Sequence, residues 1–109
     1  MSATSKITES AKGETCTFNL HGICNFNPET TVLCHAPHPD KGMRKKGPDT
    51  WAAYGCSECH LEMDGKTYRI DWKQEKYSYD GMPLGKLYFW YHAIRETQRR
   101  LIKKGLMPK

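Results

Sequence analysis

The sequence has no long hydrophobic run. A membrane-spanning helix needs roughly 18 consecutive apolar residues, and no segment of this 109-residue chain approaches that length. The stretch from Met1 to Thr15 is polar and lacks the apolar centre of a signal peptide. We therefore expect a cytoplasmic protein with reduced thiols and no membrane partner.

Apolar residues are also scarce overall. They make up 38% of the chain, and the mean hydropathy is −0.77. A chain of this length forms one domain with a small core, so a bound metal is expected to contribute to its stability. We predict a disordered N-terminal tail over residues 1–13 and a single domain over residues 14–109.

Acidic residues are outnumbered by basic ones. The chain has 12 Asp and Glu against 17 Lys and Arg, which gives a formal net charge of +5. This balance favours a polyanionic partner such as DNA. The alternative is that the charge serves only solubility, and composition does not distinguish the two.

Cysteine is present in an odd number, five, so a fully paired disulfide framework would leave one over. Cys56 and Cys59 form a C-x2-C pair, and Cys16 and Cys24 flank seven residues that can form a loop or tight hairpin. Four thiolates complete a closed structural zinc site. His60, which follows Cys59 directly, is then available for other chemistry.

The residue pattern predicts an α+β fold. Strands are expected at Thr15–Phe18 and, more strongly, at Thr30–His35, where β-branched and apolar residues gather. A loop rich in Pro, Gly and Lys covers residues 36–50. A helix is expected from near Cys56 to Gly65, which would serve as its C-cap. A short polar hairpin or strand should follow at Thr67–Trp72.

An amphipathic helix is predicted over about residues 84–104. Its apolar face follows i, i+3, i+4, i+7 spacing and comprises Leu87, Trp90, Tyr91, Ile94, Thr97 and Leu101. Basic residues crowd the remaining surface: Arg95, Arg99, Arg100, Lys103 and Lys104.

Three side chains could carry chemistry beyond the zinc site. His35 ends the strongest strand, where an imidazole can act as a general base, although most histidines are simple surface residues. His60 and Asp64 are four residues apart and therefore share one helix face, as in a half-open metal site. The alternative for Asp64 is a solvated carboxylate at a helix end. Glu62 should point elsewhere.

The chain resembles a known family through three motifs. They are Glu14-Thr15-Cys16, Cys24-Asn25-x-Asn27-Pro28-Glu29-Thr30-x-Val32-Leu33-x-His35, and Cys56-Ser57-x-Cys59-His60-x-Glu62-x-Asp64. Over about residues 13–65 they are similar to the prophage-encoded HNH-type (His-Me finger) nucleases typified by YbcO, and distantly to the phage recombination-enhancement nuclease Ref. The resemblance implies a zinc-stapled, treble-clef-like ββα-metal core over residues 14–65. It also implies metal-dependent cleavage of DNA in the cytoplasm of a bacterial host.

The same resemblance implies residue roles. His35 matches the general base, and His60 and Asp64 match ligands of a catalytic Mg²⁺ or Mn²⁺. Asp49 is the nearest counterpart of the middle HNH position, where it would orient His35 or reach the metal. Cys34 stands where many such enzymes have a metal-binding His; the alternation of side chains along a strand instead favours a core position for it.

Two basic groups are candidates for DNA binding. They are Arg44, Lys45 and Lys46 in the loop, and Arg99 and Arg100 in the last helix. A second hypothesis remains open, in which the chain is a non-catalytic zinc module that binds DNA or a recombination protein. A purely structural zinc finger would need neither His35 nor Asp64, so these two residues discriminate between the hypotheses.

Overall fold

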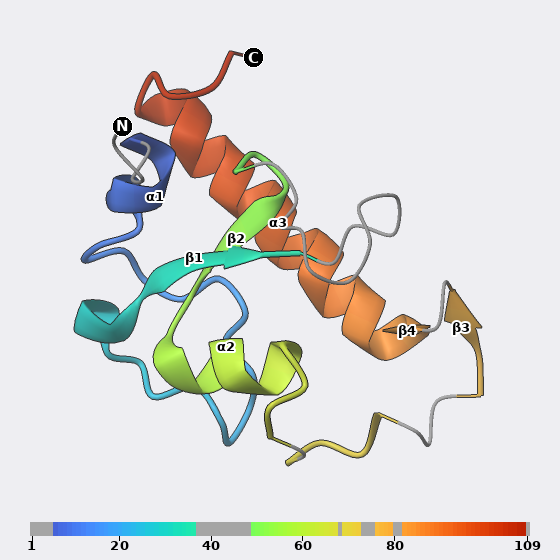
Figure 1. The fold of residues 1–109 in the computed structure, drawn as a ribbon. Coiled ribbons are helices and arrows are strands. Elements are labelled where there is room, and N and C mark those ends of the chain that lie inside the picture. Colours follow the sequence, from blue (N-terminus) through green and yellow to red (C-terminus); the bar gives the residue numbers. More distant parts are fainter. Residues whose placement is uncertain (1–5, 37–48, 68, 73–75, 80–81, 109) are drawn as a thin grey trace.

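The structure is a computed structural model that describes residues 6–36, 49–67, 69–72, 76–79 and 82–108. Its elements follow the chain in this order: α1 (Lys6–Ser10), the short 3₁₀ helix η1 (Pro28–Thr30), β1 (Val32–His35), β2 (Ala52–Gly55), α2 (Ser57–Met63), β3 (Ser78–Tyr79), β4 (Met82–Pro83) and α3 (Leu84–Lys103). In Figure 1 the β1–β2 pair occupies the centre, with α2 on one side of it and α3 running diagonally across the molecule. The segment β1–β2–α2 is a ββα unit.

The antiparallel β1–β2 pair separates two hydrophobic clusters. Its register places Leu33 opposite Tyr54 and Cys34 opposite Ala53. Leu33 and Tyr54 belong to a cluster with residues of the two chain ends, namely Ala11 and Leu101. Cys34 and Ala53 face the other cluster, whose members include Cys16, Cys24, Cys56, Cys59, Met63 and Trp90. Successive strand residues point to opposite faces, so the pair has one face for the cysteines and one for the termini.

Strand β2 was not predicted, because Ala52 and Ala53 have little intrinsic preference for strands. All four of its residues are buried. Its edge is completed by side chains and loop backbone in place of a third strand. The Tyr54 N–H donates to Thr97 Oγ1 (2.9 Å), and the Tyr54 carbonyl accepts from both the N–H and Oγ1 of Thr17 (2.8 and 2.7 Å). Tertiary contacts with α3 therefore define this strand.

Helix α3 matches the predicted C-terminal helix closely. The residues that it buries are Trp90, Ala93, Ile94, Thr97 and Leu101. The prediction that Tyr91 belongs to the core face is wrong, because Tyr91 is exposed and Ala93 is buried. Within the described residues, no helix combines the length and apolar character that crossing a membrane requires.

The N-terminal part differs from the predictions in two places. Helix α1 forms within the stretch that was predicted to be disordered, and its Ser10 Oγ lies 2.7 Å from the Tyr54 hydroxyl. The predicted strand Thr15–Phe18 is irregular, with a bend at Thr17 and Phe18, and the chain curves so that the Asn19 N–H reaches the sulfur of Cys16. The segment from Thr67 to Trp72 likewise contains no strand among its described residues. Local contacts in these segments override the β pattern.

Candidate functional site

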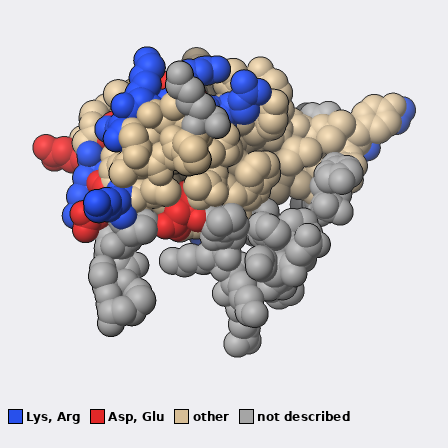
Figure 2. All heavy atoms as spheres, turned by 90° about the horizontal axis from the view of Figure 1, so that it is seen from above, with Lys and Arg blue, Asp and Glu red and all other residues tan. Residues whose placement is uncertain are grey.

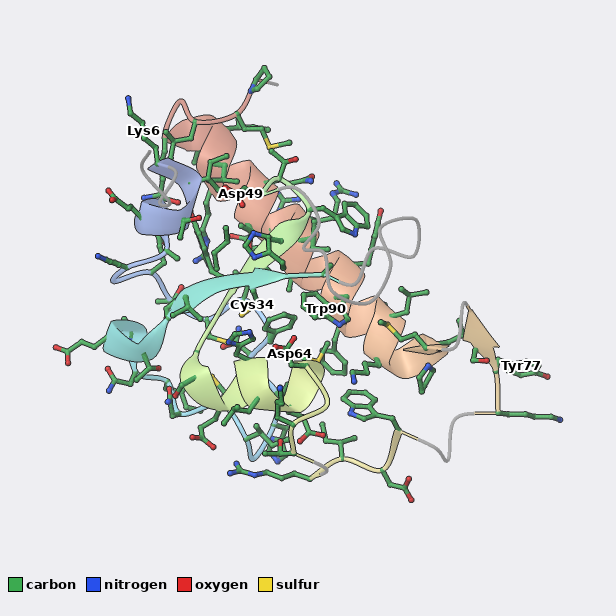
Figure 3. The ribbon with its side chains drawn as sticks, in the orientation of Figure 1. Lys6, Cys34, Asp49, Asp64, Tyr77 and Trp90 are labelled. Atoms are coloured by element: carbon green, nitrogen blue, oxygen red, sulfur yellow. The ribbon has the colours of Figure 1, made fainter. Side chains whose placement is uncertain are left out.

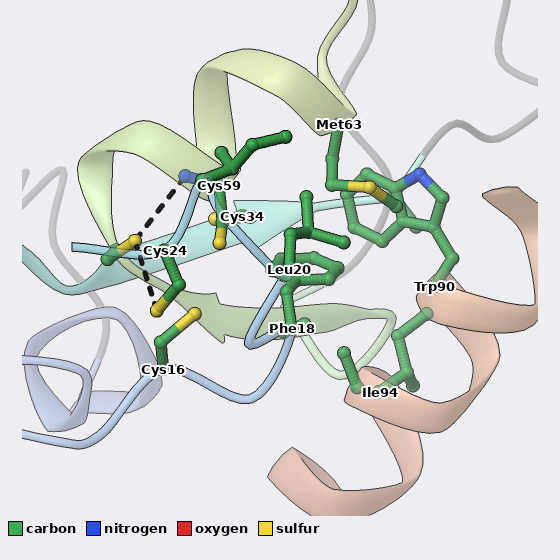
Figure 4. Packing of buried hydrophobic residues seen from close by; sticks show 14 residues of the cluster. Cys16, Phe18, Leu20, Cys24, Cys34, Cys59, Met63, Trp90 and Ile94 are labelled. Atoms are coloured by element: carbon green, nitrogen blue, oxygen red, sulfur yellow. Dashed lines mark hydrogen bonds between the residues drawn. The ribbon is translucent and has the colours of Figure 1, made fainter. Parts of the chain in front are cut away.

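Four cysteine sulfurs form a compact buried cluster. The Sγ atoms of Cys16, Cys24, Cys56 and Cys59 all lie within 4.8 Å of one another. Figure 4 shows Cys16, Cys24 and Cys59 converging beside the hydrophobic side chains of the cluster. The Cys56–Cys24 sulfur separation is 3.8 Å, which equals the edge of a tetrahedron with Zn–S bonds of about 2.3 Å. The donor set fits a structural zinc ion, as the sequence predicted.

Backbone N–H groups already point at these sulfurs. The Asn19 N–H donates to Cys16 Sγ (3.5 Å), and Asn19 adopts a left-handed conformation (φ 49°) to do so. The Cys59 N–H donates to Cys56 Sγ (3.4 Å), so Cys56 also caps the N-terminus of α2. Such donors favour the thiolate form that a zinc ligand must adopt.

The cysteine pKa values diverge within the cluster. A hydrogen bond from Cys59 lowers the pKa of Cys16 to about 5, and its counterpart raises the pKa of Cys59. Burial raises the pKa of Cys24 to about 11. Four thiolates packed this closely repel one another, so a divalent cation is the natural partner that lets all of them ionise.

A second layer of residues closes the cluster. Cys34 is fully buried, as the core hypothesis for it predicted, and burial raises the pKa of its thiol. Gly55 packs so tightly that a β-carbon there would lie 2.8 Å from the Phe18 ring and 2.9 Å from Cys34 Sγ. Only glycine fits this position without displacing its neighbours.

His35 and Asp49 form the first candidate reactive pair. His35 ends β1, Asp49 lies shortly before β2, and His35 Nε2 is 2.7 Å from Asp49 Oδ1. Their side chains are 17% and 32% exposed. A carboxylate in this place holds an imidazole in one orientation and one tautomer. The structure therefore brings Asp49 to His35, one of the two positions that the sequence left open for it.

His60 and Asp64 form the second pair. His60 lies in α2 and Asp64 is its C-cap, so the i, i+4 spacing puts His60 Nε2 3.1 Å from Asp64 Oδ2. The side chains are 34% and 37% exposed. Among the described residues, the cysteine cluster is the one group of three or more His, Cys, Asp or Glu with metal-site geometry. The His60–Asp64 pair is thus a partly exposed ion pair that offers two side chains able to bind a metal.

The two pairs lie on different faces of the β1–β2 unit. His35 follows Cys34 in β1, and alternation places it on the face of Leu33, away from the cysteine cluster. Figure 3 shows Asp49 and Asp64 on opposite sides of the β1 ribbon, with Cys34 on the side of Asp64.

Glu62 is structural, in line with the prediction that it points away from His60 and Asp64. It is fully buried. Its carboxylate accepts four hydrogen bonds, from Thr67 Oγ1 (2.6 Å), the Arg69 N–H (3.0 Å), the Ile70 N–H (3.1 Å) and Trp72 Nε1 (3.2 Å). Burial raises the pKa of Glu62, but these donors outweigh it and the pKa is lowered. Glu62 thereby ties the following segment to α2.

Lys86 is a residue that the sequence reasoning missed. It lies in the first turns of α3, and burial lowers the pKa of its ammonium while the Glu62 and Asp64 carboxylates raise it. Burial outweighs the attraction of the carboxylates, so the pKa of Lys86 is lowered. No motif marks Lys86, and only the packing of α3 toward the end of α2 reveals it.

The predicted DNA-binding residues fall into two groups. Arg44, Lys45 and Lys46 lie outside the described residues. In α3, Arg99 pairs with Glu96 (2.8 Å), whereas Arg100 pairs with both Glu96 (3.0 Å) and Glu14 (3.2 Å). In Figure 2 the Lys and Arg side chains gather toward the left of the view, the side on which Figure 1 places α1 and the C-terminal end of α3. Because Arg100 pairs with Glu14, it also anchors the segment before Cys16 to α3.

Comparisons with known proteins agree with the motifs. The family model described as "Putative nuclease YbcO" matches residues 5–105. The chain belongs to the YbcO family. The YbcO protein of Escherichia coli (strain K12) is 39% identical over 66 residues, which are 60% of this chain and 69% of the relative, and the protein of the same description from Enterobacteria phage 82 matches equally. The predicted family resemblance is thus confirmed, including its link to phages.

A solved structure supports the fold assignment. It is described as "Structure of a putative bacteriophage protein from Escherichia coli str. K-12 substr. MG1655" and is 31% identical to this chain. The match has a TM-score of 0.66 and covers 90% of this chain and 98% of the other. The overall fold of the chain is therefore shared with a protein that is described as a putative bacteriophage protein.

Proposed function

We propose that the chain is a metal-dependent DNA endonuclease of the HNH (His-Me finger) type. The observation that carries this proposal is the 2.7 Å contact between His35 Nε2 and Asp49 Oδ1. An imidazole oriented by a carboxylate at a partly exposed strand end is the arrangement of a general base. Membership of a family described as nucleases supplies independent support.

His35 would accept the proton, and Asp49 would orient the imidazole and stabilise its protonated form. When the imidazole is neutral, the Nε2–H of His35 donates to the Asp49 carboxylate, which leaves Nδ1 as the nitrogen that can accept a proton. Nδ1 then takes the proton from a water whose oxygen bonds to the phosphorus while the bond from phosphorus to the leaving 3′-oxygen breaks. The Asp49 carboxylate stabilises the imidazolium that forms. A carboxamide at position 49 would keep the size but lose this stabilisation.

His60 and Asp64 would hold the divalent ion, Mg²⁺ or Mn²⁺. When bound, this ion supplies positive charge that offsets the charge on the phosphate and the leaving oxygen. Both side chains are about one-third exposed, which leaves room for water and substrate. Lys86, whose ammonium interacts electrostatically with the Asp64 carboxylate, would add a positive charge from the protein. Because the two pairs lie on different faces of the β1–β2 unit, the proposal requires a scissile phosphate that bridges these faces.

A cleavage assay tests the proposal. Zinc-loaded protein should cut plasmid or single-stranded DNA when Mg²⁺ or Mn²⁺ is added and should be inactive without either ion. The matched variant Asp49→Asn should retain zinc and folding but cleave more slowly. Absence of cleavage by folded, zinc-loaded protein under both ions would contradict the endonuclease proposal.

The second candidate function is a non-catalytic zinc module that binds DNA or a recombination protein. The net charge of +5 and the four-cysteine cluster favour it equally well. It does not account for the His35–Asp49 pair. Binding of DNA that is unaffected by His35→Ala, together with no cleavage by the wild type, is the result that this alternative predicts.

A further inference from the structure

A groove lies away from both histidine pairs. It has a volume of about 620 Å³ and runs between α3 and the segment Thr17–Asn19. This volume falls within the range of roughly 300–1,000 Å³ that is typical of ligand pockets. None of the residues assigned to the cysteine cluster or to the histidine pairs lines it. The proposed chemistry therefore leaves this groove unused.

Exposed aromatic rings form one wall of the groove. Tyr88, Tyr91 and His92 lie on one face of α3, because they are three and four residues apart. Tyr88 is 61% exposed and Tyr91 is 53% exposed. The Tyr88 and His92 rings are stacked, with centroids 5.6 Å apart and planes 10° apart. Large exposed rings gathered at a groove are costly for a soluble protein unless they meet a ligand.

Guanidinium groups continue the same helix face. Arg95 lies over the Tyr91 ring, with Cζ 5.7 Å from the centroid, and its Nη1 donates to the Tyr91 hydroxyl (3.0 Å). Arg99 and Arg100 also line the groove, together with one carboxylate, Glu96, which both of them bind. Arg100 is also paired with Glu14 (3.2 Å), which does not line the groove, so three guanidinium groups face two carboxylates and the groove keeps one excess positive charge.

We infer that this groove binds single-stranded nucleic acid. Unpaired bases would stack on Tyr88 and Tyr91, and the phosphates would pair with Arg95 and Arg99. Interleaved aromatic rings and arginines are how proteins hold single strands, whereas a duplex keeps the faces of its bases covered. Positive charge favours this occupant over an apolar peptide. The inference extends the proposed function, since it takes nucleic acid as the partner and adds the class of strand.

Fluorescence anisotropy with labelled oligo(dT) tests the inference. The competitors are an abasic deoxyribose-phosphate strand of equal length and a duplex, all without added divalent ions so that cleavage does not interfere. The test variant is Tyr88→Ala/Tyr91→Ala. Tyr88→Phe/Tyr91→Phe keeps the rings, and Tyr77→Ala removes an exposed tyrosine outside the groove.

The alanine double variant should bind oligo(dT) more weakly by about thirty-fold or more, because it removes two rings on which bases would stack. The phenylalanine variant and Tyr77→Ala should bind as the wild type does. Affinity for the abasic strand should be unchanged by every tyrosine substitution. Arg95→Gln should lower the slope of log affinity against log salt by about 0.7.

Three results would overturn the inference. Unchanged oligo(dT) affinity in the folded, zinc-loaded alanine variant would do so, as would an equal loss on the abasic strand. A change from dimer to monomer in sedimentation, with unchanged oligonucleotide affinity, would identify a second copy of the chain as the occupant. Binding is measured without cleavage, so an inactive protein that binds oligo(dT) refutes the endonuclease proposal alone. If the protein cleaves DNA but the tyrosine variants of the groove bind oligo(dT) as the wild type does, only the groove inference is refuted.

Discussion

The cysteine cluster and the two histidine pairs are assembled around the same ββα unit but differ in their access to solvent. Each of the four clustered cysteines is at most 8% exposed, whereas the histidines and their carboxylate partners are partly exposed. Structural zinc sites are closed by four protein ligands, and catalytic metal sites keep positions open for water and substrate. One small unit thus separates a site that holds the fold together from groups that are free to react.

The largest effect on folding is expected from a substitution in the buried cysteine cluster. Cys56→Ser should remove zinc and unfold the domain, because Cys56 also caps α2 and the core is small. Metal analysis should find about one zinc per wild-type chain and none in the variant, and circular dichroism should show loss of helix.

Cys34→Ala is the matched control for this experiment. It removes a buried thiol that lies outside the cluster of four. It should keep zinc. A Cys56→Ser protein that is folded without zinc would show that the cluster is not a structural metal site.

A smaller effect is expected in the layer around the cluster. Gly55→Ala forces a β-carbon against the Phe18 ring and Cys34 Sγ. Overpacking of this kind should lower the free energy of unfolding by about 2–3 kcal/mol, measured by urea denaturation. Phe18→Leu in the same chain should recover part of the loss by making room. Wild-type stability in Gly55→Ala would mean that this layer is looser than the structure indicates.

The smallest stability effect should arise from Glu62. Glu62→Gln places an amide among four donors and should cost about 1–2 kcal/mol at neutral pH. Because folding lowers the pKa of Glu62, its contribution is present above the ordinary glutamate pKa. That contribution is lost as the pH falls through the folded-state value. Urea midpoints of wild type and variant should therefore converge in acid, and a constant difference from pH 7 downward would contradict this role.

The sequence predicted the features that depend on spacing. These include the four cysteines, the α2 register that pairs His60 with Asp64, and the long helix near residues 84–104. It missed the features that depend on tertiary packing. Strand β2 has weak local propensity and forms because α3 completes its edge through Thr97.

The contacts of the candidate site show the same division. The partnership of Asp49 with His35 spans 14 residues, so no local period reveals it, and the sequence left its role open. The position of Lys86 near Asp64 depends on how α3 packs toward α2. Tyr91 was assigned to the core from its spacing, but it is one of the rings exposed along the groove.

The most direct test that the cysteine cluster stabilises the fold while His35 acts in catalysis is single-turnover DNA cleavage by His35→Ala. The zinc content is measured on the same sample. The account predicts a rate lower by about 10²–10⁴-fold, with zinc, folding and DNA affinity unchanged. His60→Ala serves as the comparison, because raised Mg²⁺ or Mn²⁺ should restore part of its activity. Loss of zinc and folding together with activity in His35→Ala, or an unchanged cleavage rate, would contradict the account.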